Sequence, residues 1–232
     1  MAREHRVMIV YEVFQRVVEL FGEDDRRGTA FLIGTGDDQL LVTARHLCGD
    51  LAQETVRIRH SNTNDGFAFP TTITRVAVGE GASADFAVYR LPIALEVLSD
   101  VPLSHHGLTY GQNCVILGYP YGLSFQPDGN GQQRLPFAKK CIMSAAESDE
   151  DGVGKLYVDT IVNPGFSGGP LAFNVQGSRK WQFAGVVVQN IMAPMWEQKP
   201  DEPEPPKGHA RIGLVVDART ISRAIEKQRW NA

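Results

Sequence analysis

The most informative stretch of this sequence is Asn163-Pro164-Gly165-Phe166-Ser167-Gly168-Gly169-Pro170. It surrounds one serine with three glycines, so little side-chain bulk crowds the hydroxyl, and Gly165 can adopt backbone angles that other residues resist. The backbone N–H groups of Gly165 and Ser167 can therefore face the same point. Acyl transfer needs this arrangement, in which a hydroxyl nucleophile stands beside donors that stabilise the developing oxyanion. The alternative interpretation is a glycine-rich turn with an incidental serine.

A nucleophilic serine needs a base, and the base needs an acid that orients it. His46 follows the apolar residues 40–44, and Asp85 precedes the alternating apolar residues 86–91. Taken alone, a histidine or an aspartate in such a position is more often structural. The order His46, Asp85, Ser167, with each residue at the edge of a predicted strand, makes the three together a candidate catalytic set.

Composition excludes several other classes of protein. The chain has 232 residues, with 23 Lys plus Arg against 27 Asp plus Glu and a net charge of −4. This balance lacks the basic excess that is typical of nucleic-acid binding. No apolar run approaches the ~18–20 residues that a membrane span needs. A hydrophobic content of 43% is typical of a folded globular protein rather than of a disordered one.

The start of the chain and its cysteines predict a cytoplasmic location. The first six residues carry charges of both signs, and the apolar stretch after them is too short for a secretory signal. The three cysteines Cys48, Cys114 and Cys141 are an odd number and form no disulfide framework. Cys114 and Cys141 are candidates to face each other on adjacent strands, and Cys48 is expected to be a packed apolar residue.

Residues 28 to about 187 have an all-β pattern, in which short apolar or β-branched segments alternate with turn signals. The predicted strands include residues 29–33, 39–43, 56–59, 86–90, 114–118, 155–158 and 183–188. Many short strands in one chain favour β-barrels or a β-sandwich.

The N-terminal residues 1–22 are predicted to form a helix. Apolar residues recur at three- and four-residue steps over 7–21, which is typical of one helical face, and Gly22 is the expected stop. The β-branched residues in this segment also favour a strand.

The C-terminal part contains an insert, a strand and a helix. Residues 193–208 form a proline-rich acidic insert, whose prolines exclude a central strand. A strand is expected over 211–216, and a helix over 217–229 with Asp217 as its N-cap. The inward face of this helix is predicted to carry Ile221, Ala224, Ile225 and Gln228.

These segments resemble trypsin/chymotrypsin-type serine peptidases, and most closely the peptidase domain of the HtrA (Deg) branch. Thr43-Ala44-Arg45-His46 is similar to the T-A-x-H block of that family, and Asp85-Phe86-Ala87-Val88 to its D-[IL]-A-[VL] block. Residues 163–171 are similar to its N-P-G-x-S-G-G-P-L block. The resemblance covers residues 28–192 and 211–228. HtrA proteins usually carry a C-terminal PDZ domain, for which this chain has no room.

The resemblance implies a fold of two six-stranded antiparallel β-barrels with helices at the N- and C-terminal ends. The first barrel is expected at about residues 28–92 and the second at about 107–216. Together with the terminal helices they are expected to form a single peptidase domain over residues 1–232.

The resemblance also implies roles for the candidate residues. Ser167 would attack the scissile carbonyl, His46 would carry its proton to the leaving amine, and Asp85 would orient the imidazole. The N–H groups of Gly165 and Ser167 would form the oxyanion hole. The implied function is that of a serine endopeptidase that acts on a protein or peptide substrate through an acyl-enzyme, without metal or other cofactor.

The substrate-binding pocket is expected to lie between segments that precede and follow the serine. Its predicted residues are Ile161, Val162, Val188, Gln189 and Asn190. Neither wall carries an acid, so a modest apolar residue before the scissile bond is expected rather than Lys or Arg. The 193–208 insert either overhangs this pocket or is a solvated loop.

Several alternative interpretations stay open from the sequence alone. The α/β-hydrolases share the G-x-S-x-G pattern, but residues 168–170 would disrupt the helix that must follow the serine. A catalytically silent protein of this fold would still bind extended peptides by strand addition. A latent peptidase would need an activating partner, which the long glycine-rich loop 121–136 fits. His105 and His106 lack partners at metal-ligand spacing, so a surface loop is expected there.

Overall fold

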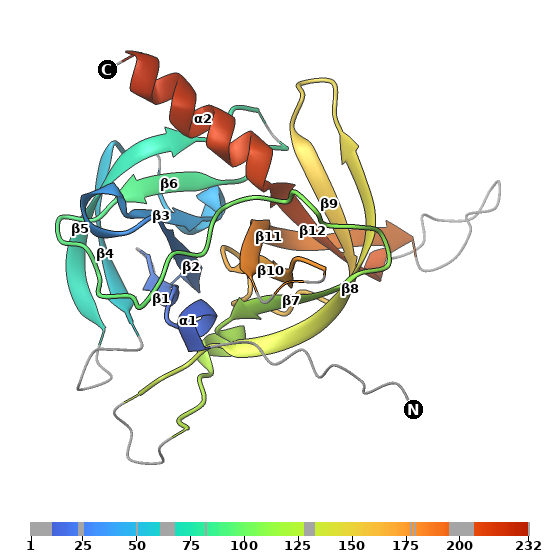
Figure 1. Ribbon diagram of the computed structural model, residues 1–232, viewed down its shortest axis with the longest axis horizontal. Coiled ribbons are helices and arrows are strands. Elements are labelled where there is room, and N and C mark those ends of the chain that lie inside the picture. Colours follow the sequence, from blue (N-terminus) through green and yellow to red (C-terminus); the bar gives the residue numbers. More distant parts are fainter. Residues whose placement is uncertain are drawn as a thin grey trace.

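Two closed β-barrels, each built from six antiparallel strands, make up the body of the chain, as Figure 1 shows. The computed structural model describes residues 11–22, 26–49, 51–60, 68–81, 83–127, 133–176, 178, 180–194 and 207–231. This architecture confirms the predicted all-β class with two barrels and a helix near each end. Within the described residues, neither α-helix is long and apolar enough to cross a membrane.

The first barrel contains strands β1 to β6. Their bounds are Val17–Phe21 (β1), Arg27–Ile33 (β2), Leu40–Thr43 (β3), Gln53–Arg59 (β4), Phe69–Val78 (β5) and Ala87–Arg90 (β6). The order around the barrel is β1-β2-β3-β6-β5-β4, and the pairing of β1 with β4 closes it. The 3-10 helices η2 (Gly36–Asp38) and η3 (Arg45–Leu47) lie between its strands. Burial alternates along β4, because successive side chains of a strand point to opposite faces.

The second barrel contains strands β7 to β12. Their bounds are Asn113–Gly118 (β7), Phe137–Ser148 (β8), Gly154–Asp159 (β9), Pro170–Asn174 (β10), Trp181–Pro194 (β11) and Lys207–Asp217 (β12). The order is β10-β11-β12-β9-β8-β7, and the 3-10 helix η4 (Pro120–Gly122) follows β7. Cys114 and Cys141 lie directly opposite each other on β7 and β8, and both are buried free thiols.

The predicted N-terminal helix is wrong over its second half. Only α1 (Tyr11–Phe14) is helical, Val17–Phe21 is strand β1, and residues 1–10 lie outside the described residues. The first barrel therefore begins at Val17 rather than near residue 28. Four successive residues of β1 are buried, so both faces of this strand are covered. A strand buried on both faces has a continuous apolar run, which periodicity does not distinguish from a helix.

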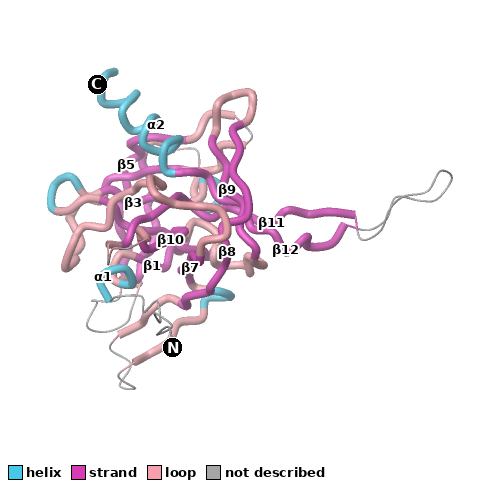
Figure 2. Tube along the Cα trace, turned by 45° about the vertical axis from the view of Figure 1, so that its right-hand side comes forward, coloured by secondary structure: helices cyan, strands magenta, loops and turns pink. Residues whose placement is uncertain are grey.

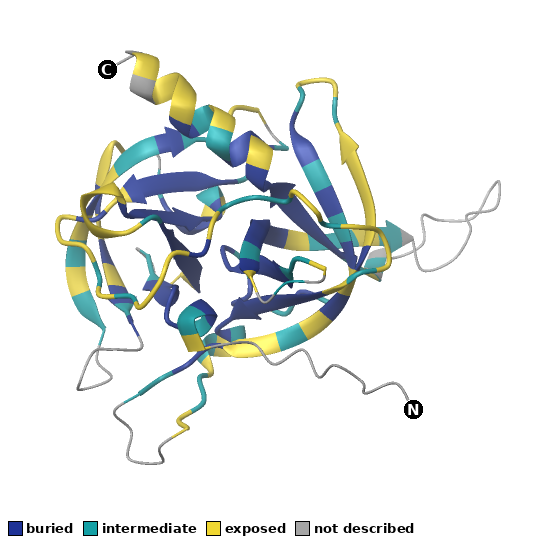
Figure 3. Ribbon diagram, in the orientation of Figure 1, coloured by how far each residue is buried: buried dark blue, intermediate teal, exposed yellow. Residues whose placement is uncertain are grey.

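The C-terminal helix α2 (Ala218–Asn231) spans both barrels. It contacts β5 of the first barrel and β11 and β12 of the second, and its outer face is exposed in Figure 3. The backbone N–H of Thr220 donates to Asp217 Oδ1 at 2.7 Å, which confirms Asp217 as the N-cap. Ile221 and Ile225 are buried, whereas Gln228 is exposed and does not belong to the inward face.

The ends of the predicted 193–208 insert belong to the β-ladder. Strands β11 and β12 continue past the barrel, where Met192 pairs with His209 and Ala193 with Gly208. Figure 2 shows this hairpin projecting from the body of the protein. The described ladder ends where Pro194 pairs with Lys207, since an edge strand tolerates a proline. Residues 195–206 lie outside the described residues, so the predicted overhang is not tested.

Arg16, between α1 and β1, is the largest fully buried side chain. Its Nη1 donates to Leu32 O at 3.1 Å and to Gly34 O at 3.0 Å, and its Nε donates to Ser99 O at 2.7 Å. Burial lowers the pKa of Arg16, and the nearby Asp100 charge opposes that effect. The guanidinium thus supplies donors to carbonyl groups of β2 and of the connection between the barrels.

Replacing Arg16 by Leu is expected to lower the free energy of unfolding by about 3 kcal/mol, because buried carbonyl groups lose their donors. Urea unfolding at neutral pH measures this change. Arg57→Leu, at an exposed arginine of the same barrel, is the control and should change it by less than about 1 kcal/mol. An equal effect of the two substitutions would contradict this role of Arg16.

Candidate active site

The three residues predicted from sequence come from both barrels and meet in one place. His46 lies in η3 directly after β3, Asp85 lies just before β6, and Ser167 lies in the turn between β9 and β10. His46 Nδ1 is 2.6 Å from Asp85 Oδ2, and His46 Nε2 is 2.9 Å from Ser167 Oγ. The three side chains therefore form one continuous hydrogen-bonded row from carboxylate to hydroxyl.

Asp85 is held by His46 through both carboxylate oxygens. Besides the ring contact, the backbone N–H of His46 donates to Asp85 Oδ1 at 3.0 Å. Burial raises the pKa of Asp85, but the hydrogen bonds and charge of His46, together with the charge of Arg45, outweigh it, and the pKa lies below its usual value. An ionised Asp85 fixes Nδ1 as the protonated ring nitrogen and leaves Nε2 to accept.

The Ser167 hydroxyl has two acceptors within reach. Its Oγ is 2.9 Å from His46 Nε2 and also 2.9 Å from the carbonyl oxygen of Val188. A hydroxyl carries one hydrogen, so it donates to only one of them at a time. Occupation of the Val188 carbonyl by another donor would direct the hydroxyl proton to His46.

Residues 163–166 form a type II turn. Phe166 N donates to Asn163 O at 3.1 Å, and Gly165 has φ +99° at the third position of the turn. The carbonyl of Pro164 accepts from Tyr121 N at 2.8 Å. Because C=O and N–H point in opposite directions across a trans peptide, the Gly165 N–H points away from Tyr121. A side chain at Gly165 would collide with the Tyr119 carbonyl, so glycine is required here.

Thr29 of β2 joins the serine turn to the first barrel. Its backbone N–H donates to Ser167 O at 2.9 Å, and its hydroxyl donates to Gly165 O at 2.6 Å. The same hydroxyl oxygen accepts from Tyr119 N at 3.1 Å. Thr29 lies in a predicted strand, but the sequence does not mark it, or Tyr121, as part of the site. No local signal in one sequence marks contacts between segments so far apart.

The two predicted pocket walls are joined by the side chain of Asn190. Val162 N donates to Asn190 Oδ1 at 2.6 Å, and Asn190 Nδ2 donates to Val162 O at 2.7 Å. Ile161 lies on the same wall, where its carbonyl accepts from Lys139 Nζ at 2.5 Å. The Asn190 amide therefore crosses the space between the walls.

The other two predicted pocket residues border a second space. Val188 and Gln189, together with His46 and Asp85, line a cavity of about 440 Å³. The structure thus divides the five predicted binding residues into two groups. Asn190 is bonded to the segment of Ile161 and Val162, and Val188 and Gln189 border the cavity beside His46.

The remaining candidate residues are Cys48, His105 and His106. Burial raises the pKa of Cys48 to about 12, which leaves it a poor nucleophile. His105 Nδ1 lies 3.5 Å from Asp217 Oδ2. Across the described ranges, no three His, Cys, Asp or Glu side chains gather in a group that could hold a metal ion.

The glycine-rich loop 121–136 is packed at both ends. The Phe125 ring packs edge to face against the rings of Phe14 and Phe137, with distances of 6.1 and 6.2 Å between ring centroids. Phe125 and Leu135 exchange two backbone hydrogen bonds. Residues 128–132 lie outside the described residues, so the role of this loop in latency is not tested.

The chain is similar to known proteins both in sequence and in structure. A family model for the trypsin-like peptidase domain matches residues 28–178. No curated protein matches the sequence. The inactive form of the Rv3671c protease from M. tuberculosis is similar in structure, with a TM-score of 0.58 and 20% identity, over 93% of this chain and 89% of that one.

Two further solved structures are similar at low sequence identity. The serine endoprotease from Yersinia pestis gives a TM-score of 0.59 at 18% identity, over 94% of this chain and 64% of that one. The HtrA-type protease AlgW, solved with a tripeptide, gives 0.60 at 17% identity, over 93% of this chain and 60% of that one. At such identities the likeness shows the fold, and this chain spans less than two thirds of these two chains.

The lowered pKa of Asp85 predicts a pH-dependent contribution to stability. A carboxyl whose pKa is lowered by folding stabilises the folded state above its unfolded pKa of about 3.9, and the contribution is lost as pH falls through the folded value. Wild type is expected to exceed Asp85→Asn in free energy of unfolding at pH 6, and the difference should shrink below about pH 4. Denaturant unfolding from pH 6 to 3 measures it. A difference that stays constant over this range would contradict the assignment.

Proposed function

The chain belongs to the trypsin-like peptidase domain family, and on this premise we propose that it is a serine endopeptidase with Ser167 as nucleophile. The observation that carries the proposal is the unbroken row from Asp85 through His46 to Ser167, with contacts of 2.6 and 2.9 Å. These are hydrogen-bond distances at which proton transfer between the groups is feasible.

The proposed reaction begins with attack of Ser167 Oγ on the carbonyl carbon of the scissile bond. His46 Nε2 takes the hydroxyl proton as the C–O bond forms, and Asp85 stabilises the resulting imidazolium. His46 then gives this proton to the leaving amine as the C–N bond breaks, which leaves an acyl-enzyme. Water, deprotonated by the same imidazole, releases the acid and restores the Ser167 hydroxyl.

The oxyanion of each tetrahedral intermediate is proposed to bind the N–H groups of Gly165 and Ser167. The type II turn supports this role, because the Tyr121–Pro164 hydrogen bond of 2.8 Å fixes the peptide that carries the Gly165 N–H. Donors fixed before the reaction need no reorganisation when charge develops. This geometry favours an assembled site over a latent one.

The substrate is proposed to bind as an added strand along Val188 to Asn190. The Val188 carbonyl, now 2.9 Å from Ser167 Oγ, would accept an N–H from the substrate backbone, which frees the hydroxyl for His46. The Asn190 amide bridges to Val162, and we propose that a modest apolar residue occupies P1, the position before the scissile bond, beside this amide.

Hydrolysis of small-P1 peptides, followed by mass spectrometry of the products, tests the proposed function. Ser167→Ala is expected to lower kcat by at least about 10⁴-fold, whereas Ser144→Ala, at an exposed serine of β8, should leave it unchanged. Equal activity of wild type and Ser167→Ala would contradict the proposal. Peptide binding without cleavage by wild type would favour the catalytically silent peptide-binding module.

The P1 restriction is tested separately at Asn190. Asn190→Gly removes the bridging amide, so kcat/KM for a Phe-P1 peptide relative to an Ala-P1 peptide should rise about tenfold or more. Asn113→Gly, at an exposed asparagine of β7, is the matched control and should leave this ratio unchanged. An unchanged ratio in Asn190→Gly would show that another group limits the pocket.

A further inference from the structure

The cavity of about 440 Å³ beside His46 has a basic lining. Three of the described residues that line it are cations, namely Arg26, Arg45 and Lys155, and Asp85 is the one carboxylate among them. The chain as a whole carries a net charge of −4, so this local positive charge is opposite in sign to the net charge of the protein. A cleft lined by one sign of charge attracts groups of the opposite sign.

The carboxylate in the lining is fully engaged. Asp85 accepts the backbone N–H and the ring N–H of His46 with its two oxygens, at 3.0 and 2.6 Å. It therefore balances His46 when that ring takes up a proton during the reaction, and the charge of Arg45 also acts on this carboxylate.

Two cations in the lining keep donors for a ligand. Arg45 donates through Nη1 to Gly79 O at 3.1 Å, and a guanidinium has five N–H donors in all. Lys155 Nζ lies 3.1 Å from Asp149 Oδ2, with only 17% of its side chain exposed, and an ammonium has three donors. Lys155 is thus held in place and partly neutralised, but still able to bind a second anion.

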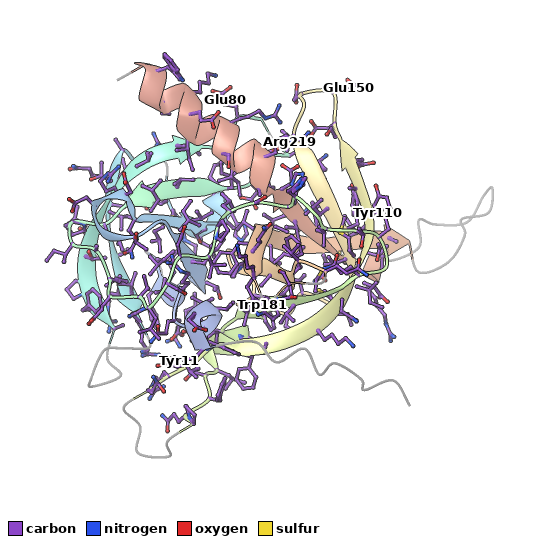
Figure 4. All side chains as sticks on the ribbon, viewed as in Figure 1. Tyr11, Glu80, Tyr110, Glu150, Trp181 and Arg219 are labelled. Atoms are coloured by element: carbon purple, nitrogen blue, oxygen red, sulfur yellow. The ribbon has the colours of Figure 1, made fainter. Side chains whose placement is uncertain are left out.

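Asp149 belongs to the turn of the β8–β9 hairpin, outside the cavity lining. Its Oδ2 also accepts from Ser83 Oγ at 2.5 Å and its Oδ1 from Val153 N at 2.8 Å. Its neighbour Glu150 lies at the tip of the hairpin in Figure 4. The Asp149 carboxylate is therefore occupied in tying the hairpin to the loop before Asp85, which keeps Lys155 at the cavity wall.

The strand edge from Val188 to Asn190 determines which substrate residue reaches this cavity. Side chains of an added strand point alternately to its two faces. If the P1 side chain enters the pocket that Asn190 crosses, the P2 side chain, one residue earlier, points to the opposite face. That face holds the cavity that Val188 and Gln189 border together with His46.

We propose that this cavity is the P2 subsite and that it selects an acidic side chain, Glu or Asp. The inference rests on the proposed peptidase function and adds to it a class of substrate, peptides with an acid followed by a small apolar residue before the scissile bond. Arg45 and Lys155 are the residues that determine this selectivity.

Three peptides that differ only at P2, as Glu, Gln or Lys, with Val at P1, test the inference. Wild type should cleave the Glu peptide about two- to fivefold better than the matched Gln peptide in kcat/KM, the range expected for partly exposed charge pairs, and the Lys peptide worst. The preference should weaken as NaCl rises from about 0.05 to 0.5 M, because salt screens such pairs.

Variants of the two cations assign the preference to the cavity. Arg45→Gln and Lys155→Met should each bring the ratio of kcat/KM for the Glu peptide to that for the Gln peptide toward one. A general loss of activity would lower both values equally and leave this ratio unchanged. Lys140→Met, at an exposed lysine of β8, removes the same charge elsewhere and should leave the ratio unchanged. A Glu/Gln ratio of one in wild type, or a ratio that neither variant changes, would overturn the inference while leaving the peptidase function intact.

A binding measurement separates this inference from the proposed catalysis. The affinities of Ser167→Ala for the three peptides, measured by calorimetry, should follow the same order, Glu above Gln above Lys. If wild type cleaves nothing but this order holds, the peptidase function fails and the acidic subsite stands. If no peptide is either cleaved or bound, both are overturned.

Discussion

The contacts of Thr29 are the constraint on which the site depends. This residue of the first barrel donates its backbone N–H to Ser167 O and its hydroxyl to Gly165 O, so it ties the serine turn of the second barrel to β2. Its carbonyl accepts from Thr43 Oγ1 at 2.8 Å, near the end of the strand that leads to His46. Thr29 thereby connects the turn that carries Ser167 on one barrel with the strand that leads to His46 on the other.

Much of the fold and of the site can be predicted from local sequence. The features that cannot be predicted depend on burial or on contacts between distant residues. The strands around His46, Asp85 and Ser167 are predictable, because turn residues and short apolar runs mark them in the sequence itself. Strand β1 (Val17–Phe21) is not, since burial on both faces hides the alternation that marks a strand. The bridge between Val162 and Asn190 is also not predictable, because the pairing of residues so far apart depends on the closed barrel.

The strand edge from Val188 to Asn190 is common to the two proposed substrate preferences, an apolar residue at P1 and an acidic one at P2. One face of an added strand meets the neutral amide of Asn190, which is bonded to the Val162 backbone. The other face meets the cavity with Arg45 and Lys155 in its lining. Because neighbouring residues of a strand alternate between faces, the same edge would present the Asn190 amide and the basic cavity to successive residues of the proposed substrate.

Labelling with a fluorophosphonate, which reacts with activated serine hydroxyl groups, tests the central claim most directly. We expect the folded wild type to gain one phosphonyl group, mapped by mass spectrometry to Ser167, and Ser167→Ala to gain none. Such a result would show that the row of Asp85, His46 and Ser167 activates the nucleophile. No adduct on the folded wild type, or an adduct on a different residue, would contradict the account.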